Sequence, residues 1–205
     1  MPLVAIIEYG AGNLDSVARA VEYCGGSPLV TQDAKDVRKA SHIILPGVGS
    51  FASGMRNLRA RGYENELNEQ VKVKGVPFLG ICLGMQFLAT LGTESEEMHG
   101  LGWIEGSVIR LASLFPHEKI PHMGWNRIDV SRESPLLAGI ESGKDFYFVH
   151  SYHFVTRDES DVLTTTPYCG GFTSSVARGN IFGVQFHPEK SQRGGFQMLK
   201  NFLAM

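Results

Sequence analysis

The chain has 205 residues, of which 43% are hydrophobic and 20% charged, and its formal net charge is −2 at pH 7. This composition excludes an intrinsically disordered protein and argues against a general nucleic-acid binder or a basic membrane-surface protein. We expect one domain over residues 1–205, long enough to fold without disulfides, and the three separated cysteines predict no disulfide framework. A Met-Pro start without a signal-peptide pattern, and no apolar run of about 20 residues, predict a cytoplasmic protein.

The first half of the chain alternates apolar strands with helical patterns. The predicted strands are Leu3–Ile7, Pro28–Thr31, His42–Leu45 and Val76–Ile81. Helical spacing occurs at Leu14–Val21, Asp36–Ala40, Ala52–Arg59 and Tyr63–Lys74, and again after Cys82 at Met85, Phe87, Leu88 and Leu91. This alternation predicts an α/β fold with a mostly parallel central sheet, helices on both faces, and ligand chemistry at the carboxyl ends of the strands.

The second half, from about Gly102, is rich in β-branched and aromatic residues. The predicted strand segments are Trp103–Leu111, Trp125–Val130, Phe146–Val155, Val162–Thr165, Phe172–Arg178 and Ile181–Phe186. They predict an antiparallel second half, followed by a closing helix around Phe196–Leu203. The acidic run Glu94–Glu97 is most simply a solvated loop.

Cys82 is the first candidate catalytic residue. It lies in Gly80-Ile81-Cys82-Leu83-Gly84, where an apolar run meets a helical pattern. This is the form of a nucleophile elbow, a strained strand-turn-helix bend, with Cys in place of Ser. The following helix N-terminus favours a thiolate. The alternative is a small buried cysteine of no chemical consequence.

His187 and Glu189 are the second candidate group, because they follow a strand just as Cys82 does. Residues two apart in an extended segment point the same way, and Pro188 holds His187 in extended geometry. The carboxylate of Glu189 is therefore expected to orient the imidazole toward the thiol. A turn without catalytic function is the alternative.

Backbone N–H groups of Leu83 and Val48 are the candidate oxyanion donors, because Leu83 opens the helix and the Pro46–Gly49 loop is rich in glycine. We expect no metal, because the cysteines lack paired spacing and His150 and His153 should face opposite sides of one strand. We also expect no cofactor. Asp15 stands where a dinucleotide fingerprint needs its third glycine, and Gly139–Asp145 does not complete a phosphate-binding loop.

Taken together, Pro46–Gly49, Gly80–Gln86 and His187–Glu189 resemble the motifs of class I (triad-type) glutamine amidotransferases, essentially from end to end. More specific segments resemble the glutaminase subunits of imidazole glycerol phosphate synthases, which act in histidine biosynthesis. These segments are Tyr9–Leu14, Pro121–Asn126, Tyr147–Tyr152 and His187–Ser191. Departures are mild: Glu8 stands where relatives often have Asp, and Ser151 where many have Thr.

The resemblance implies that Cys82, His187 and Glu189 hydrolyse glutamine through a thioester, and that Gly49, Gln86, Ser151 and Tyr152 bind the glutamine. It also implies a (β/α)₈-barrel cyclase as the partner in a heterodimer. The ammonia would pass to that partner, which makes imidazole glycerol phosphate and an aminoimidazole carboxamide ribotide. The candidate interface residues are Asn13, Met123, Trp125, Tyr147 and Lys190. The alternatives are a component of another amidotransferase, a free-standing γ-glutamyl hydrolase, and a non-catalytic module of the same fold.

Overall fold

A nine-stranded sheet runs through the protein in the computed structural model, which describes residues 1–205. The strand order is β2-β1-β3-β4-β13-β12-β11-β8-β9. The pairs from β2 to β13 are parallel, and the pairs from β13 to β9 are antiparallel. The strands of this sheet are β1 (Leu3–Ile7), β2 (Ser27–Thr31), β3 (His42–Gly47), β4 (Phe78–Cys82), β8 (His122–Val130), β9 (Lys144–His150), β11 (Val162–Thr166), β12 (Phe172–Arg178) and β13 (Ile181–Val184). The α/β fold class with an antiparallel second half is therefore confirmed.

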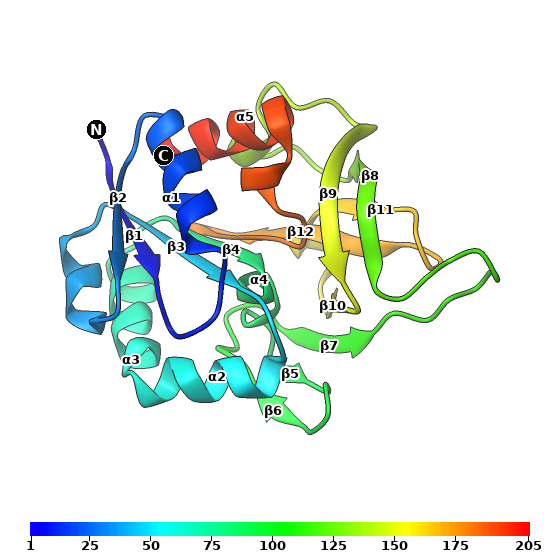
Figure 1. The fold of residues 1–205 in the computed structure, drawn as a ribbon, viewed down its shortest axis with the longest axis horizontal. Coiled ribbons are helices and arrows are strands. Elements are labelled where there is room, and N and C mark those ends of the chain that lie inside the picture. Colours follow the sequence, from blue (N-terminus) through cyan, green and yellow to red (C-terminus); the bar gives the residue numbers. More distant parts are fainter.

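A second, smaller sheet has the order β10-β7-β5-β6. Its strands are β5 (Leu91–Gly92), β6 (Met98–His99), β7 (Gly106–Arg110) and β10 (Tyr152–Thr156). It lies at the lower centre of Figure 1, below the antiparallel half of the large sheet.

Helices cover both faces of the parallel half of the sheet (Figure 1). α1 (Leu14–Tyr23) and α5 (Gln192–Leu203) lie on one face, and α2 (Phe51–Ala60) and α3 (Tyr63–Leu67) lie on the other. A four-residue helix, α4 (Leu83–Gln86), follows β4 in the centre of the molecule. Short helical turns of the 3₁₀ or π type occur at Ala34–Lys39, Asn68–Val73, Pro135–Leu137, Glu159–Asp161 and Pro188–Lys190. None of the helices has the length and apolar character needed to cross a bilayer.

Strand β1 shows why the parallel strands are apolar on both sides. Val4 and Ile6 pack into the cluster that contains α1 and α5, while Ala5 and Ile7 pack into the cluster under α2 and α3. All four side chains are completely buried. Burial of each isoleucine contributes about 1.5–3 kcal/mol. The continuous apolar run of this strand is thus typical of a sheet that helices cover on both faces.

The predicted helix after Cys82 is too long, because α4 ends at Gln86 and Leu91 begins β5. The carbonyls that would extend the helix are taken by another segment. Leu101 N–H donates to the Phe87 carbonyl at 2.7 Å, and Trp103 N–H donates to the Leu88 carbonyl at 3.0 Å. A distant loop thus terminates the helix by competing for its backbone acceptors.

Two other predicted segments are interrupted. The helical stretch Tyr63–Lys74 is an α-helix only to Leu67 and continues as a π-type segment, Asn68–Val73. The segment Phe146–Val155 breaks at Ser151 into β9 and β10, which belong to different sheets. His150 and His153 therefore lie on different strands, which corrects the expectation that they share one.

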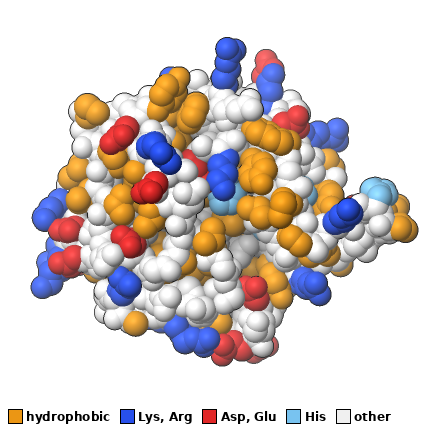
Figure 2. Space-filling model, viewed as in Figure 1, with side chains coloured by type: hydrophobic (Ala, Val, Ile, Leu, Met, Phe, Trp, Pro, Cys, Tyr) orange, Lys and Arg blue, Asp and Glu red, His pale blue; other side chains and the backbone are white.

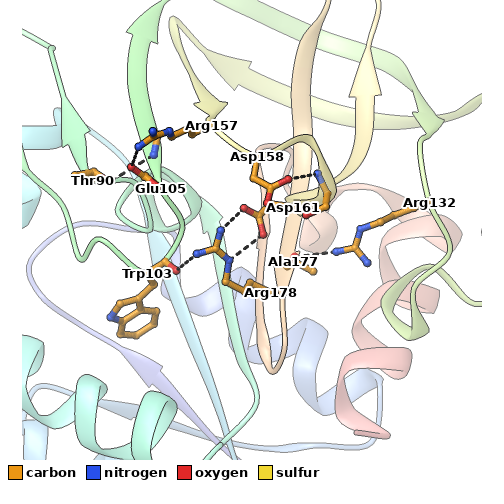
Figure 3. Close-up of polar contacts among 11 residues, drawn as sticks. Thr90, Trp103, Glu105, Arg132, Arg157, Asp158, Asp161, Ala177 and Arg178 are labelled. Carbon is orange, nitrogen blue, oxygen red and sulfur yellow. Dashed lines mark hydrogen bonds and ion pairs between the residues drawn. The ribbon is translucent and has the colours of Figure 1, made fainter.

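An ion pair of Arg178 fixes the turn that leads into β13. Its guanidinium donates to both carboxylate oxygens of Asp161, at 2.9 Å and 2.5 Å, and Asp161 is 4% exposed. A third donor nitrogen lies 3.4 Å from the Trp103 carbonyl (Figure 3). A bidentate pair of this kind fixes the relative orientation of the two side chains and also holds them together by charge. Arg178 therefore anchors the hairpin whose second strand delivers His187.

Candidate active site

Cys82 occupies a strained bend between β4 and α4. Its backbone angles are φ 55° and ψ −109°, a region that non-glycine residues rarely adopt. A Cβ at Gly84 would overlap the carbonyl oxygen of Leu45 on β3, so no larger residue fits there without a shift of the backbone. The predicted elbow is therefore present. Because α4 has only four residues, its dipole supports the thiolate less than the sequence suggests.

His187 and Glu189 form a buried pair at the end of the neighbouring strand. His187 Nδ1 lies 2.8 Å from Glu189 Oε1, and the two side chains are 4% and 1% exposed. The backbone of His187 is also fixed, because its N–H donates to the Tyr147 carbonyl at 2.9 Å and its carbonyl accepts from Ser191 Oγ at 2.6 Å. The structure thus brings together the base and the carboxylate that the sequence predicts.

The imidazole of His187 is poised as a cation. Burial, the largest single effect, lowers its pKa, but hydrogen bonding and charge from Cys82 and Glu189 outweigh burial and raise the pKa to about 10. Nε2 is buried and makes no hydrogen bond within the chain; β13, which leads to His187, pairs in parallel with β4, which ends at Cys82. Loose nucleophile–base contacts of this kind are common before substrate binds. The arrangement favours the protonated form of His187.

A cleft of about 250 Å³ opens above the sulfur. Its lining residues are Val48, Gly49, Cys82, Leu83, Gln86, Glu94, Val149, His150, Ser151 and Tyr152. All the residues predicted to hold the oxyanion or the glutamine are among them. Larger hollows exist, including one of about 680 Å³ next to β10 and β12, but its lining contains no cysteine. The chemistry, not the size, identifies the candidate site.

The Pro46–Gly49 loop, here called the oxyanion loop because Val48 is a predicted oxyanion donor, can change its backbone conformation. Val48 is 44% exposed, and its N–H is not committed to a backbone hydrogen bond within the chain. Gly49 has φ +96°, a conformation that disfavours any residue with a side chain. The loop can therefore reorient a peptide group toward the cleft without losing an existing backbone hydrogen bond of Val48.

Gln185 is a site residue that the sequence analysis missed. Its Nε2 lies 3.7 Å from Cys82 Sγ, and its Oε1 accepts from Gln86 Nε2 at 3.0 Å. Gln86 also donates to the Tyr152 carbonyl at 3.0 Å, so its amide nitrogen is fully engaged and its oxygen remains to meet a ligand. Alternation along the strand was the available signal, because Gln185 is two residues before His187 and points to the same side.

Glu94 is a second missed residue, and the solvated-loop interpretation is wrong for it. Its Oε2 accepts from the N–H of Phe51 at 2.8 Å, which caps α2, and the side chain lines the cleft. Glu96 is also paired, with Arg56 at 2.8 Å. Glu94 is the only carboxylate among the lining residues, and no local pattern distinguishes it from Glu96 and Glu97.

A chain of hydrogen bonds runs from β8 to the cleft. His150 Nδ1 lies 2.8 Å from the Tyr152 carbonyl, which can only accept, so this nitrogen carries the proton. His150 Nε2 then accepts from His122 Nδ1 at 3.1 Å, and His122 Nε2 accepts from Asn126 Nδ2 at 3.3 Å. Burial lowers the pKa of His122 to about 4 and that of His150 to about 3. Two neutral histidines thus hold the carbonyl that orients Gln86.

The candidate interface residues lie on the surface beside this network. Met123 and Trp125 of β8 are 64% and 48% exposed, so Trp125 is not a core residue. The Trp125 and Tyr147 rings are 6.0 Å apart, and Lys190 Nζ lies 5.8 Å from the Tyr147 ring centroid. Hydrophobic side chains gather over β8 and β9 on the face shown in Figure 2. Asn13, also exposed, precedes α1.

A cysteine at a strained bend and a buried His–Glu pair on the neighbouring strand of an α/β sheet are typical of one class of protein, the enzymes with a nucleophilic cysteine. Residues 5–205 match the family described as "Glutamine amidotransferase class-I". The chain is 48% identical over 199 residues to the imidazole glycerol phosphate synthase subunit HisH of Moorella thermoacetica, covering 97% of this chain and 93% of the relative. It is 48% identical to HisH 2 of Nitrobacter winogradskyi over 208 residues, covering 99% and 98%.

Solved structures agree on the fold. The structure of PurLQS from Thermotoga maritima has a TM-score of 0.77 at 21% identity, covering 99% of this chain and 98% of that one. The crystal structure of a glutamine amidotransferase from Thermotoga maritima has a TM-score of 0.63 at 21% identity, covering 94% and 78%. The chain belongs to the class I glutamine amidotransferase family, within its group of HisH subunits of imidazole glycerol phosphate synthase. The resemblance found in the sequence is therefore confirmed.

Proposed function

We propose that this chain is the glutaminase subunit of imidazole glycerol phosphate synthase, which hydrolyses glutamine to glutamate and ammonia. The observation that carries the proposal is the buried His187–Glu189 pair, which follows the strand next to that of Cys82, together with the cleft that Cys82 lines with one carboxylate. The HisH names of the relatives point to the same reaction.

In the first half-reaction, the Cys82 thiolate attacks the carboxamide carbon of glutamine. The N–H groups of Leu83 and Val48 stabilise the resulting oxyanion, a contribution of about 10²–10³-fold per donor. His187 gives its proton to the departing nitrogen, and ammonia leaves a glutamyl thioester. In the second half, neutral His187 takes a proton from water, the hydroxide attacks the thioester, and glutamate leaves as the thiolate re-forms.

Binding of glutamine is assigned to the cleft walls. The α-ammonium of the substrate is a cation, and the Glu94 carboxylate is the anion available to it. Gly49, Gln86, Ser151 and Tyr152 would hold the α-carboxylate and the carboxamide through backbone groups, the Ser151 hydroxyl and the Gln86 oxygen.

The ammonia must reach a second active site before water protonates it. We assign the partner as a (β/α)₈-barrel cyclase that docks over the cleft. The exposed Met123 and Trp125 and the half-buried Tyr147, with Lys190 next to the Tyr147 ring, form an apolar surface with a polar rim that suits a protein contact, and we assign the exposed Asn13 to the same interface. The cyclase would combine ammonia with a phosphoribulosyl aminoimidazole carboxamide nucleotide to make imidazole glycerol phosphate and an aminoimidazole carboxamide ribotide.

The test is an assay of glutamate release by the chain alone, with the purified cyclase, and with the cyclase and its nucleotide. We expect weak activity alone, a large increase with the loaded cyclase, and none from Cys82→Ala. Equal full rates with and without the partner would indicate a free-standing hydrolase. Retained activity in Cys82→Ala would overturn the mechanism.

A further inference from the structure

Tyr9, at the end of β1, has a buried hydroxyl that nothing in the chain satisfies. The side chain is 0% exposed, and its oxygen makes no hydrogen bond with any residue. Buried hydroxyls are normally paired, and an unpaired one destabilises the folded state. Tyr63 gives the contrast, because it is equally buried but donates to the Thr31 carbonyl at 2.7 Å. The orphaned hydroxyl of Tyr9 therefore requires an explanation.

The hydroxyl of Tyr9 lies next to Gly47 of the oxyanion loop. A Cβ added at Gly47 would overlap the Tyr9 oxygen and lie 2.9 Å from Leu83 Cβ. Burial, and then the charge of Cys82, raise the pKa of Tyr9 above its ordinary value, so the hydroxyl keeps its proton and remains a donor. Tyr9 is not among the residues that line the cleft, so its hydroxyl meets Gly47 outside the cleft.

The Gly47–Val48 peptide couples the two sides of the loop. In a planar trans peptide, the Gly47 carbonyl and the Val48 N–H point in opposite directions. Turning the Val48 N–H toward the oxyanion therefore turns the Gly47 carbonyl away from the cleft. A carbonyl facing the protein interior needs a donor, and the Tyr9 hydroxyl is the donor without an acceptor beside Gly47.

We propose that Tyr9 is a positioning residue whose hydroxyl donates to the Gly47 carbonyl when the loop adopts its active conformation. Because the same hydroxyl is unpaired in the resting protein, its hydrogen bond favours the active loop selectively. The inference rests on the proposed glutaminase function and deepens it, since it assigns one group that biases the loop toward oxyanion binding.

Tyr9→Phe removes the hydroxyl and keeps the ring, which packs edge-on against Phe87 at 5.8 Å. With the loaded cyclase present, we expect kcat for glutamate release to fall by about 5- to 50-fold, with KM for glutamine within twofold of the parent. The Tm should stay the same or rise by about 1–3 °C, because an unpaired polar group is removed. Tyr63→Phe is the matched control: its kcat should be unchanged and its Tm about 2–6 °C lower.

The outcomes separate this inference from the proposed function. If the parent chain with its partner releases no glutamate, the proposed function fails and the inference fails with it. If the parent is active and Tyr9→Phe keeps the parental stimulated kcat, only the role of Tyr9 is overturned. A Tm loss in Tyr9→Phe as large as that of Tyr63→Phe would also overturn it, because the hydroxyl would then be bonded in the resting protein.

Discussion

Glu189→Gln is the substitution that tests the triad most directly. It keeps the size of the side chain and removes the charge that faces His187 Nδ1 across 2.8 Å. Since both side chains are almost completely buried, this is a charge-assisted hydrogen bond shielded from water, worth about 1.5–3 kcal/mol. At about 1.4 kcal/mol per factor of ten, kcat should fall by about 10- to 150-fold.

The pH profile should move as well. In the proposed mechanism imidazolium is the form that protonates the departing nitrogen, and in the parent it persists until the pH rises through about 10. Without the Glu189 charge the pKa of His187 falls, so the alkaline limb of kcat should shift to lower pH. The free energy of unfolding should depend on pH through the same group. Because the pKa of His187 is raised, its protonation contributes stability that is complete below about pH 6.5 and is lost as the pH rises toward about 10. The variant should lose less stability than the parent over that range.

The assay is glutamate release with the cyclase partner from pH 6 to 11, beside thermal unfolding at the same pH values. Glu141→Gln is the control, because its carboxylate is 82% exposed and lies 3.4 Å from Lys144. An unchanged kcat together with an unmoved alkaline limb in Glu189→Gln would refute the reasoning.

Three further substitutions test other parts of the structure. Glu94→Gln should raise KM for glutamine about tenfold with kcat within twofold, while Glu97→Gln on the same loop changes neither; an unchanged KM would contradict the assignment. Gly84→Ala places a methyl group against the Leu45 carbonyl and should cost at least about 2 kcal/mol in denaturant unfolding, and parental stability would contradict the close approach. His122 is neutral when folded, with a pKa of about 4, so stability should fall as the pH drops from 6.5 toward 4, by up to about 1.4 kcal/mol per pH unit. His122→Gln should reduce the slope in urea titrations by that amount and leave the part due to His150, whose pKa of about 3 acts in the same direction; an identical slope would show that the proton goes elsewhere.

Local rules were enough to predict the bend at Cys82 and the pairing of His187 with Glu189. The glycine pattern around Cys82 specifies a bend that only a narrow set of residues permits, and the observed φ of 55° confirms it. The alternation of His187 and Glu189 along an extended segment placed their side chains together, as the 2.8 Å contact confirms. Hydrophobic periodicity likewise predicted the parallel sheet, because the strands are buried on both faces.

The features that were not predicted all depend on register or on distant segments. His122 and His150 meet because β8 and β9 pair with these two residues opposite each other, and no short-range pattern sets that register. The length of α4 depends on a loop that competes for its carbonyls. Glu94 is one of several similar acids, and only the cap on α2 distinguishes it. Tertiary context therefore decided the supporting parts of the site.

The division of the triad between β4 and β13 has a consequence for the life of the thiol. β4 is made early in synthesis, whereas β13 and the imidazole that follows it come near the end of the chain. Until the last hairpin inserts beside β4, the sulfur lacks the imidazole of His187 and the amide of Gln185. The growing polypeptide therefore carries Cys82 without its predicted base until the chain is almost complete.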